Sequence, residues 1–224
     1  MKKVIITTFS ILGLFILPVK AIEFPFDSKS FGVSLTGMSL DTTVKDDIDS
    51  NGTIDTTKDI SNDFVVPSIF LEVNKDLANG GMLTVGLDLI PMTAEMETRT
   101  TTQSSNGGSN GTNKGTVDAK NHLTAYVKLG GEVRGNELFV LGGYMYAEGD
   151  YDLQSVSSTN RTGTVNIKGT KIGVGLERDI PVGFMRLMLS ENSYDTIAAT
   201  TSNATRVTAD MDSTNLTLSI GKNF

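Results

Sequence analysis

A polar segment at residues 47–55 has the residue types and spacing to bind a calcium ion. Its candidate ligands are hard oxygens, supplied by Asp47, Asp49, Asn51, Thr53 and Asp55. Gly52 falls where the first nine positions of a calcium-binding loop require a sharp turn. The twelfth position should be a bidentate glutamate, but it is Lys58. We therefore predict an ordinary acidic surface loop, because Asp, Asn and Gly are common in turns, with weak calcium binding by these residues as the alternative.

Six charged residues could interact inside the molecule, because each alternates with apolar neighbours. They are Glu72, Asp88, Lys128, Lys171, Glu177 and Arg186. Side chains two positions apart on a strand share a face, so these charges lie opposite the apolar face. If they point inward, opposite charges should pair, since an unpaired buried charge is costly. The set predicts a polar plug, with the lining of a narrow ion pore as the alternative.

The single histidine, His122, is the natural candidate for a catalytic base. It falls at the start of the strand predicted around 123–129, and we interpret it as a solvated side chain. We therefore expect no enzymatic activity, and no cofactor other than the candidate calcium ion.

The elements that position these residues are strands, because apolar and polar residues alternate in one segment after another. Alternation predicts eight strands, around residues 31–36, 65–73, 83–89, 123–129, 138–148, 171–177, 185–190 and 216–224. The facing of 138–148 stays open, since both of its parities are apolar. Pro67 predicts a bulge, because proline removes a ladder donor.

The predicted connections alternate in length. Short turns are expected at 75–81, 134–136 and 179–183, and long polar loops at 44–62, 97–121, 149–162 and 196–204. This order suits an all-β fold, an eight-stranded antiparallel up-and-down transmembrane β-barrel with its short turns in the periplasm. Aromatic residues are expected to form girdles at the two membrane interfaces: Phe31, Phe70, Phe139, Phe184 and Phe224 on the periplasmic side, and Phe64, Tyr146, Tyr151 and Tyr194 on the outer side. A soluble barrel is the competing fold, but it would bury its apolar parity and expose the charged one.

The N-terminus has the pattern of a secretory signal peptide. Lys2 and Lys3 precede a mostly apolar stretch, and Val19-Lys20-Ala21 places small residues before a cut at Ile22. We predict a signal peptide at 1–21, a periplasmic segment at 22–30 and the barrel at 31–224.

Composition excludes other classes. The chain has no cysteine, so a disulfide scaffold is excluded. Its net charge is −7 and it has no Lys/Arg cluster, which argues against nucleic acid as a partner.

The C-terminal strand carries the most specific resemblance. Leu216, Leu218, Ile220 and Phe224 share one parity, and Phe224 ends the sequence. This ending resembles the signal strand of Gram-negative outer-membrane barrels, and the chain looks like their small OmpA/OmpX-type members. The resemblance implies a monomer in the bacterial outer membrane, with membrane lipid and the barrel-assembly machinery as partners.

Function follows less directly. The resemblance implies a surface or envelope-stabilising protein whose exposed loops bind a ligand or partner. A narrow porin-like channel is the alternative. A lipid hydrolase is a third reading, and it is disfavoured because Thr124 stands where lipid A deacylases carry a serine two residues after the histidine.

Overall fold

The computed structural model describes residues 26–47, 52–103, 111–154, 161–200 and 206–224. The predicted signal peptide lies outside the described residues. The strands are β1 (Ser28–Asp47), β2 (Thr56–Asp76), β3 (Gly81–Ile90), β4 (Ala94–Gln103), β5 (Gly111–Val133), β6 (Asn136–Gln154), β7 (Arg161–Ile180), β8 (Gly183–Tyr194), β9 (Ile197–Thr200) and β10 (Arg206–Asn223), with one 3₁₀ turn, η1 (Ala78–Gly80). No described helix is long and apolar enough to cross a membrane.

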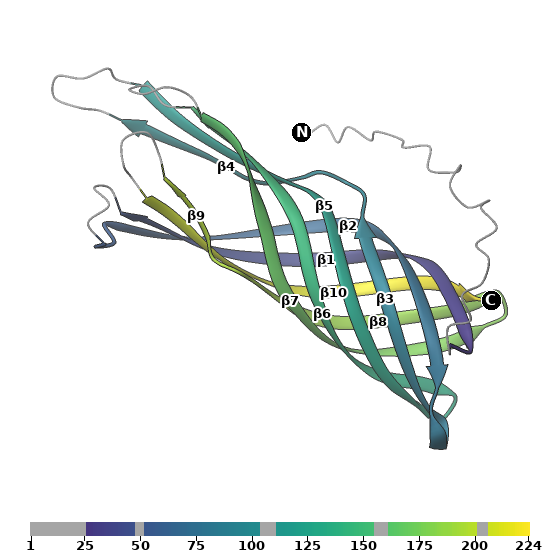
Figure 1. Ribbon diagram of the computed structural model, residues 1–224. Coiled ribbons are helices and arrows are strands. Elements are labelled where there is room, and N and C mark those ends of the chain that lie inside the picture. Colours follow the sequence, from purple (N-terminus) through teal and green to yellow (C-terminus); the bar gives the residue numbers. More distant parts are fainter. Residues whose placement is uncertain (1–25, 48–51, 104–110, 155–160, 201–205) are drawn as a thin grey trace.

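The strands form one closed antiparallel ring (Figure 1). Neighbours pair in the order β1-β2-β3-β5-β6-β7-β8-β10, and β10 pairs with β1 to complete the circle of eight. The closing register runs from Ser30↔Asn223 to Asp47↔Arg206 without a shift. The two remaining strands continue their predecessors, β4 beside β5 and β9 beside β10. The predicted eight-stranded up-and-down barrel is therefore confirmed.

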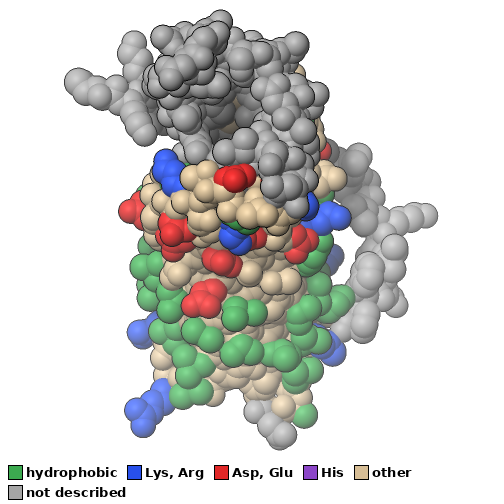
Figure 2. Space-filling model, turned by 90° about the vertical axis from the view of Figure 1, so that its left-hand side faces the viewer, with side chains coloured by type: hydrophobic (Ala, Val, Ile, Leu, Met, Phe, Trp, Pro, Cys, Tyr) green, Lys and Arg blue, Asp and Glu red, His purple; other side chains and the backbone are tan. Residues whose placement is uncertain are grey.

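Apolar side chains cover the outside of the barrel, as the alternation predicts. Val33 is 53% exposed, Ile172 63% and Leu216 55%, although all three are large and apolar. Figure 2 shows such side chains as a belt around the lower part of the barrel, with acidic side chains above it. The open question of 138–148 is also answered: Leu138 and Val140 face outward, whereas Phe139 and Leu141 are buried.

The short connections are where the sequence places them. η1 links β2 to β3, and Arg134-Gly135 forms the turn between β5 and β6 with φ of 56° and 75°. The long connections are shorter than predicted. β4 and β5 occupy much of 97–121, and β1 and β2 extend to Asp47 and from Thr56. The prediction failed because threonine-rich sequence looks like a loop by polarity, although its β-branched side chains favour strands once a partner is in register.

The predicted bulge at Pro67 is wrong. Pro67 pairs with Leu35 in a continuous β1–β2 register. On the other side, β2 pairs with β3 only as far as Ile69↔Leu89. Proline thus sits beyond the point where that side of β2 has a described partner strand, so its missing N–H interrupts no ladder. The register shifts lie instead between Lys120 and Leu123 and in β4.

Beyond the point where β2 stops pairing with β3, on the side away from the short turns, the barrel wall divides into two lobes. The lobes splay apart in Figure 1. The first lobe consists of β4 and the adjoining ends of β5, β6 and β7. The second lobe consists of β9 and the adjoining ends of β10, β1 and β2. In the described residues, β4 pairs only with β5 and β9 only with β10. Two seams therefore separate the lobes, one between β2 and β4 and one between β7 and β9.

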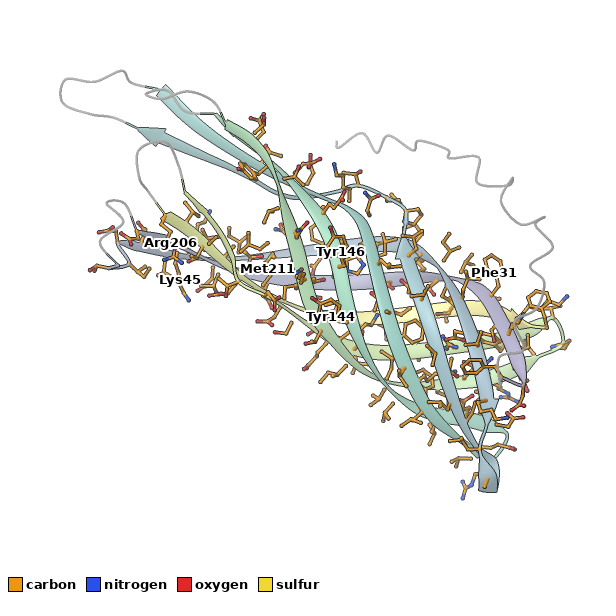
Figure 3. The ribbon with its side chains drawn as sticks, in the orientation of Figure 1. Phe31, Lys45, Tyr144, Tyr146, Arg206 and Met211 are labelled. Carbon is orange, nitrogen blue, oxygen red and sulfur yellow. The ribbon has the colours of Figure 1, made fainter. Side chains whose placement is uncertain are left out.

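The aromatic girdles are only partly as predicted. Phe31 and Phe224 face outward at one end, and Tyr144 and Tyr146 face outward nearer the lobes (Figure 3). Three of the predicted periplasmic rings are instead buried inside the barrel: Phe70, Phe139 and Phe184. On the outer side, Phe64 and Tyr194 pack against a buried apolar cluster, and Tyr151 lies over Gly163. These side chains lie on the inward parity, which proximity to a strand end could not reveal.

Candidate functional site

Arg186 lies at the centre of a buried charge network near the short-turn end of the barrel. Its Nε donates to Glu177 Oε2 at 2.7 Å, and its Nη2 donates to Glu72 Oε2 at 2.8 Å. The Arg186 and Glu72 side chains are 5% and 1% exposed. Because β2, β7 and β8 each supply one of these residues, the network ties separate parts of the wall together. Such charge-assisted bonds are strong where water is excluded.

Lys128 and Tyr126 complete the network from β5. Lys128 Nζ donates to Glu177 Oε2 at 3.0 Å and lies 3.5 Å from Glu137 Oε1. The Tyr126 hydroxyl donates to Glu72 Oε1 at 2.7 Å. The sequence analysis missed Tyr126, although it shares the parity of Lys128. It also missed Glu137, for which the doubly apolar 138–148 segment gave no usable signal.

Three aromatic rings surround the guanidinium of Arg186. Its Cζ lies 5.1 Å from the Phe70 ring centroid, 5.2 Å from that of Phe184 and 5.6 Å from that of Phe139. These distances fall within the range of cation–π attraction. Lys128 Nζ lies 5.0 Å from the Phe139 centroid. The rings and the ion pairs together fill the lumen at this level.

Each of these rings rests on a glycine directly opposite it in the neighbouring strand. The pairs are Phe70 with Gly32, Phe139 with Gly175, and Phe184 with Gly221. A Cβ on any of these glycines would collide with the ring. The glycines thus allow the rings to lie flat against the wall, the aromatic–glycine pairing that relieves crowding in curved sheets.

The remaining two predicted lumen charges form a separate tier nearer the lobes. Asp88 accepts a hydrogen bond from Ser68 Oγ at 2.9 Å. Lys171 lines the same small cavity as Asp88, with ≈ 30 Å³ of room for water centres. No acid in the described chain lies within ion-pair distance of Lys171. Hence the structure brings Glu72, Lys128, Glu177 and Arg186 together but leaves Asp88 and Lys171 apart from them.

His122 is not a solvated side chain, contrary to the sequence-based interpretation. It lines the cavity between the two tiers, and both ring nitrogens are buried without a hydrogen-bond partner in the described structure. His122 lies two residues before Thr124 on the inward parity of β5, so parity could have placed it. No described serine, cysteine or carboxylate is hydrogen-bonded to its ring.

An apolar cluster lies on the lobe side of the cavity. Leu40, Ala147, Ile167 and Met211 are at most 5% exposed. Along their strands they lie beyond cavity residues such as Met38, Lys171 and Asn215. Figure 3 places Met211 where the lobes begin to separate. This apolar cap and the Arg186 network therefore lie on opposite sides of the cavity.

The lobes carry their charges on their outer faces. Lys120 donates to Asp150 at 2.6 Å, and Lys45 donates to Asp210 at 2.8 Å. These hydrogen bonds from lysine lower the pKa of both the Asp150 and the Asp210 carboxyl groups. All four side chains are at least one-third exposed, so each pair adds little stability.

The candidate calcium segment is only partly described. Asp47 Oδ2 accepts a hydrogen bond from the Gly52 amide at 2.9 Å, and Gly52 has φ of 88°. Gly52 thus makes the sharp turn that its sequence position predicts. Asp49 and Asn51 lie outside the described residues, and no described group of three acidic, histidine or cysteine side chains is arranged to hold a metal ion. Calcium binding at 47–55 stays an untested alternative to an ordinary acidic loop.

The terminal strand has the geometry expected of an assembly signal. Leu216, Leu218 and Ile220 face outward, and Phe224 is 72% exposed. The Phe224 amide donates to the Lys29 carbonyl at 2.9 Å, so the last residue joins the closing strand pair. The ring itself contacts only Lys222 among the ring interactions of the described residues.

If the Phe224 ring is the assembly signal that the sequence resemblance implies, Phe224→Ala should lower the amount of folded barrel in the outer membrane severalfold. Val182→Ala is the matched control, since Val182 is 73% exposed at the same end of the barrel. Heat-modifiable mobility of the membrane fraction on gels measures the folded amount. Equal amounts for both variants would contradict the assembly role of the ring.

The closed ring, apolar exterior and charged interior are the fold of the small outer-membrane β-barrels. No protein-family model matches the chain, and no curated protein matches it. Solved structures do resemble it. Ail, the attachment invasion locus protein of Yersinia pestis, is 12% identical over 85% of this chain and 99% of Ail, with a TM-score of 0.37. The outer membrane protease OmpT of Escherichia coli is 10% identical over 90% of this chain and 99% of OmpT, with a TM-score of 0.48. Neisserial surface protein A is 10% identical over 82% of this chain and 96% of its own, with a TM-score of 0.31. These likenesses concern the fold alone.

Proposed function

We propose that this protein is a bacterial outer-membrane surface protein whose barrel is a closed anchor and whose two lobes bind an external partner. The observation that carries the proposal is the length of the strands beyond the apolar belt. On β1 the outward apolar positions end near Leu35, yet the strand continues to Asp47. Short turns would suffice to close the barrel at that level, so the extra strand length must serve another purpose.

The inner faces of the lobes favour an apolar partner. Partly buried apolar residues lie on the inward parity above the cap: Val44, Ile60, Val207, Ala209 and Ile197 in the second lobe, and Ala119 and Val165 in the first. Apolar surface that stays accessible between two splayed sheets is typical of an interaction site.

The seams favour a partner in extended conformation. Along the seams, β4 and β9 have one described partner strand each, and the lobe segments of β2 and β7 likewise pair on one side only. Unpaired edge strands present backbone N–H and C=O groups that another strand can satisfy. Addition of an extended peptide to such an edge is a known mode of recognition, with alternate side chains entering apolar surface. The proposed partner is therefore an extended polypeptide with alternating apolar side chains.

Trimming the lobes tests this function. Glu95 pairs with Asp118, and Thr43 pairs with Asp59. Residues 96–117 and 44–58 can therefore each be replaced by an Asn-Gly turn that keeps the flanking register. We expect the trimmed protein to fold into the outer membrane but to lose binding to a library of ten-residue peptides with alternating apolar and polar residues.

The untrimmed protein should bind a subset of these peptides and slow hydrogen exchange at amides of β2 and β4. Equal peptide binding by the trimmed protein, or no binding by the untrimmed one, would show that the lobes are not a peptide-binding surface.

A further inference from the structure

We propose that the cavity between the two charge tiers is an internal hydration site, in which bound water bridges Lys171 to Asp88 and to His122. This inference is independent of the proposed lobe function. It concerns the two predicted lumen charges that the Arg186 network does not include.

Unpartnered polar atoms point to a ligand in this cavity. The atoms are His122 Nδ1, His122 Nε2, Asn192 Oδ1 and Asn215 Oδ1, all from residues that line the cavity and all buried without a hydrogen-bond partner in the described structure. Asn215 and Asn192 are only 1% and 4% exposed. A buried polar group without a partner is destabilising, because it has lost its hydrogen bonds to water. Several such atoms around one cavity are therefore best explained by a shared small polar ligand.

The size of the cavity selects water. It offers ≈ 30 Å³ of room for water centres and is lined by His122, Asn192, Asn215 and Lys171. One buried water needs about 10–15 Å³ of room for its centre, and two to four polar partners. The cavity therefore suits about two water molecules and is too small for a sugar, an acyl chain or a peptide side chain.

The charges of the lumen agree with a bridging water. In the lower tier each acid, Glu72, Glu137 or Glu177, lies within ion-pair distance of Lys128 or Arg186. The upper tier contains one acid, Asp88, and one base, Lys171, and both line the cavity. A neutral pair of this kind, beyond direct contact, is stabilised when water donates to the carboxylate and accepts from the ammonium group.

His122 fits the same role. Its ring is buried beside Lys171 and can accept or donate one hydrogen bond at each nitrogen in the neutral form. The charged groups that line the same cavity are Lys171 on β7, Asp88 on β3 and Arg186 on β8. With two bases and one acid beside it, a neutral ring that bonds to water is the favoured arrangement.

The cavity should hold its water for a long time, because the apolar cap and the Arg186 network close its two ends. Water-selective NMR on the ¹⁵N-labelled full chain in lipid nanodiscs tests this directly. We expect cross-peaks from long-lived water to the side-chain amide protons of Asn192 and Asn215. The matched control is Asn136, whose side chain lies in an exposed turn and donates to the Arg134 carbonyl at 3.3 Å. Asn192 and Asn215 amides that show no long-lived water contact would overturn the proposal.

A double-mutant cycle supplies a second measurement. We expect Asp88→Asn and Lys171→Met each to raise the equilibrium constant for unfolding about tenfold to a hundredfold, because each leaves a buried charge without its counterpart. The double variant should be less destabilised than the product of the two single effects. Full additivity would mean that Asp88 and Lys171 are not coupled, and would overturn the water bridge.

Discussion

Arg186→Met is expected to destabilise the barrel by about 3–5 kcal/mol, because it removes one partner of a buried charge network. Glu72 and Glu177 would each lose a charge-assisted hydrogen bond while remaining buried. The aliphatic methionine would still fill much of the space between the rings, so the loss reports mainly on charge. Urea titration of the protein in lipid vesicles, followed by heat-modifiable gel mobility, measures the free energy of unfolding.

Arg178→Met is the matched control for this prediction. Arg178 belongs to β7, close to Glu177, but it faces outward and is exposed. Its replacement should change the free energy of unfolding by less than about 0.5 kcal/mol. Similar losses for both variants would mean that the buried network contributes no more than a surface charge.

Gly175→Val is expected to destabilise the barrel by about 1–3 kcal/mol through overpacking. A Cβ at Gly175 would collide with the Phe139 ring and approach the Leu187 carbonyl at 2.7 Å. Moving Phe139 would also weaken its contacts with Lys128 and Arg186, which lie 5.0 and 5.6 Å from the ring centroid. The same urea titration measures the effect.

Gly142→Val separates this steric effect from the general effect of replacing a strand glycine. A Cβ at Gly142 would meet no atom within 4 Å. Gly142 lies on the outward parity of β6, so valine there would face lipid. Its replacement should be neutral or slightly stabilising, because valine favours strands. A loss as large as that of Gly175→Val would refute the aromatic–glycine explanation.

The architecture could be predicted from the sequence because a membrane barrel repeats one simple rule along its whole length. Alternation identified the strands and placed all six predicted charges on the inward face. Glu72 and Arg186, for example, come from strands far apart in sequence yet meet in the lumen. Alternation could not predict how far along the barrel axis each charged side chain lies. The stagger of the strands decides which charges lie at one level, so the sequence could not tell that Asp88 and Lys171 lie apart from the Arg186 network.

The burial of two aromatic residues that were expected in the girdles could have been predicted from the sequence. Phe70 lies two residues before Glu72, and Phe184 two residues before Arg186, so parity places both rings inside the barrel. The girdle prediction used distance from the strand end and ignored parity. The length of the lobes had no such signal, because Thr-rich sequence is compatible with a loop or with a paired strand, and only the cross-strand partners decide between them.

Planar-bilayer recording of the purified full chain tests the central claim, that the lumen is closed by the Arg186 network on one side and the apolar cap on the other. We predict that insertion of the wild-type barrel produces no steady ion current above the leak of the bare bilayer. A reproducible unitary current that disappears when Lys171 or Asp88 is neutralised would instead reveal a conducting path through the cavity, and the protein would be a narrow channel.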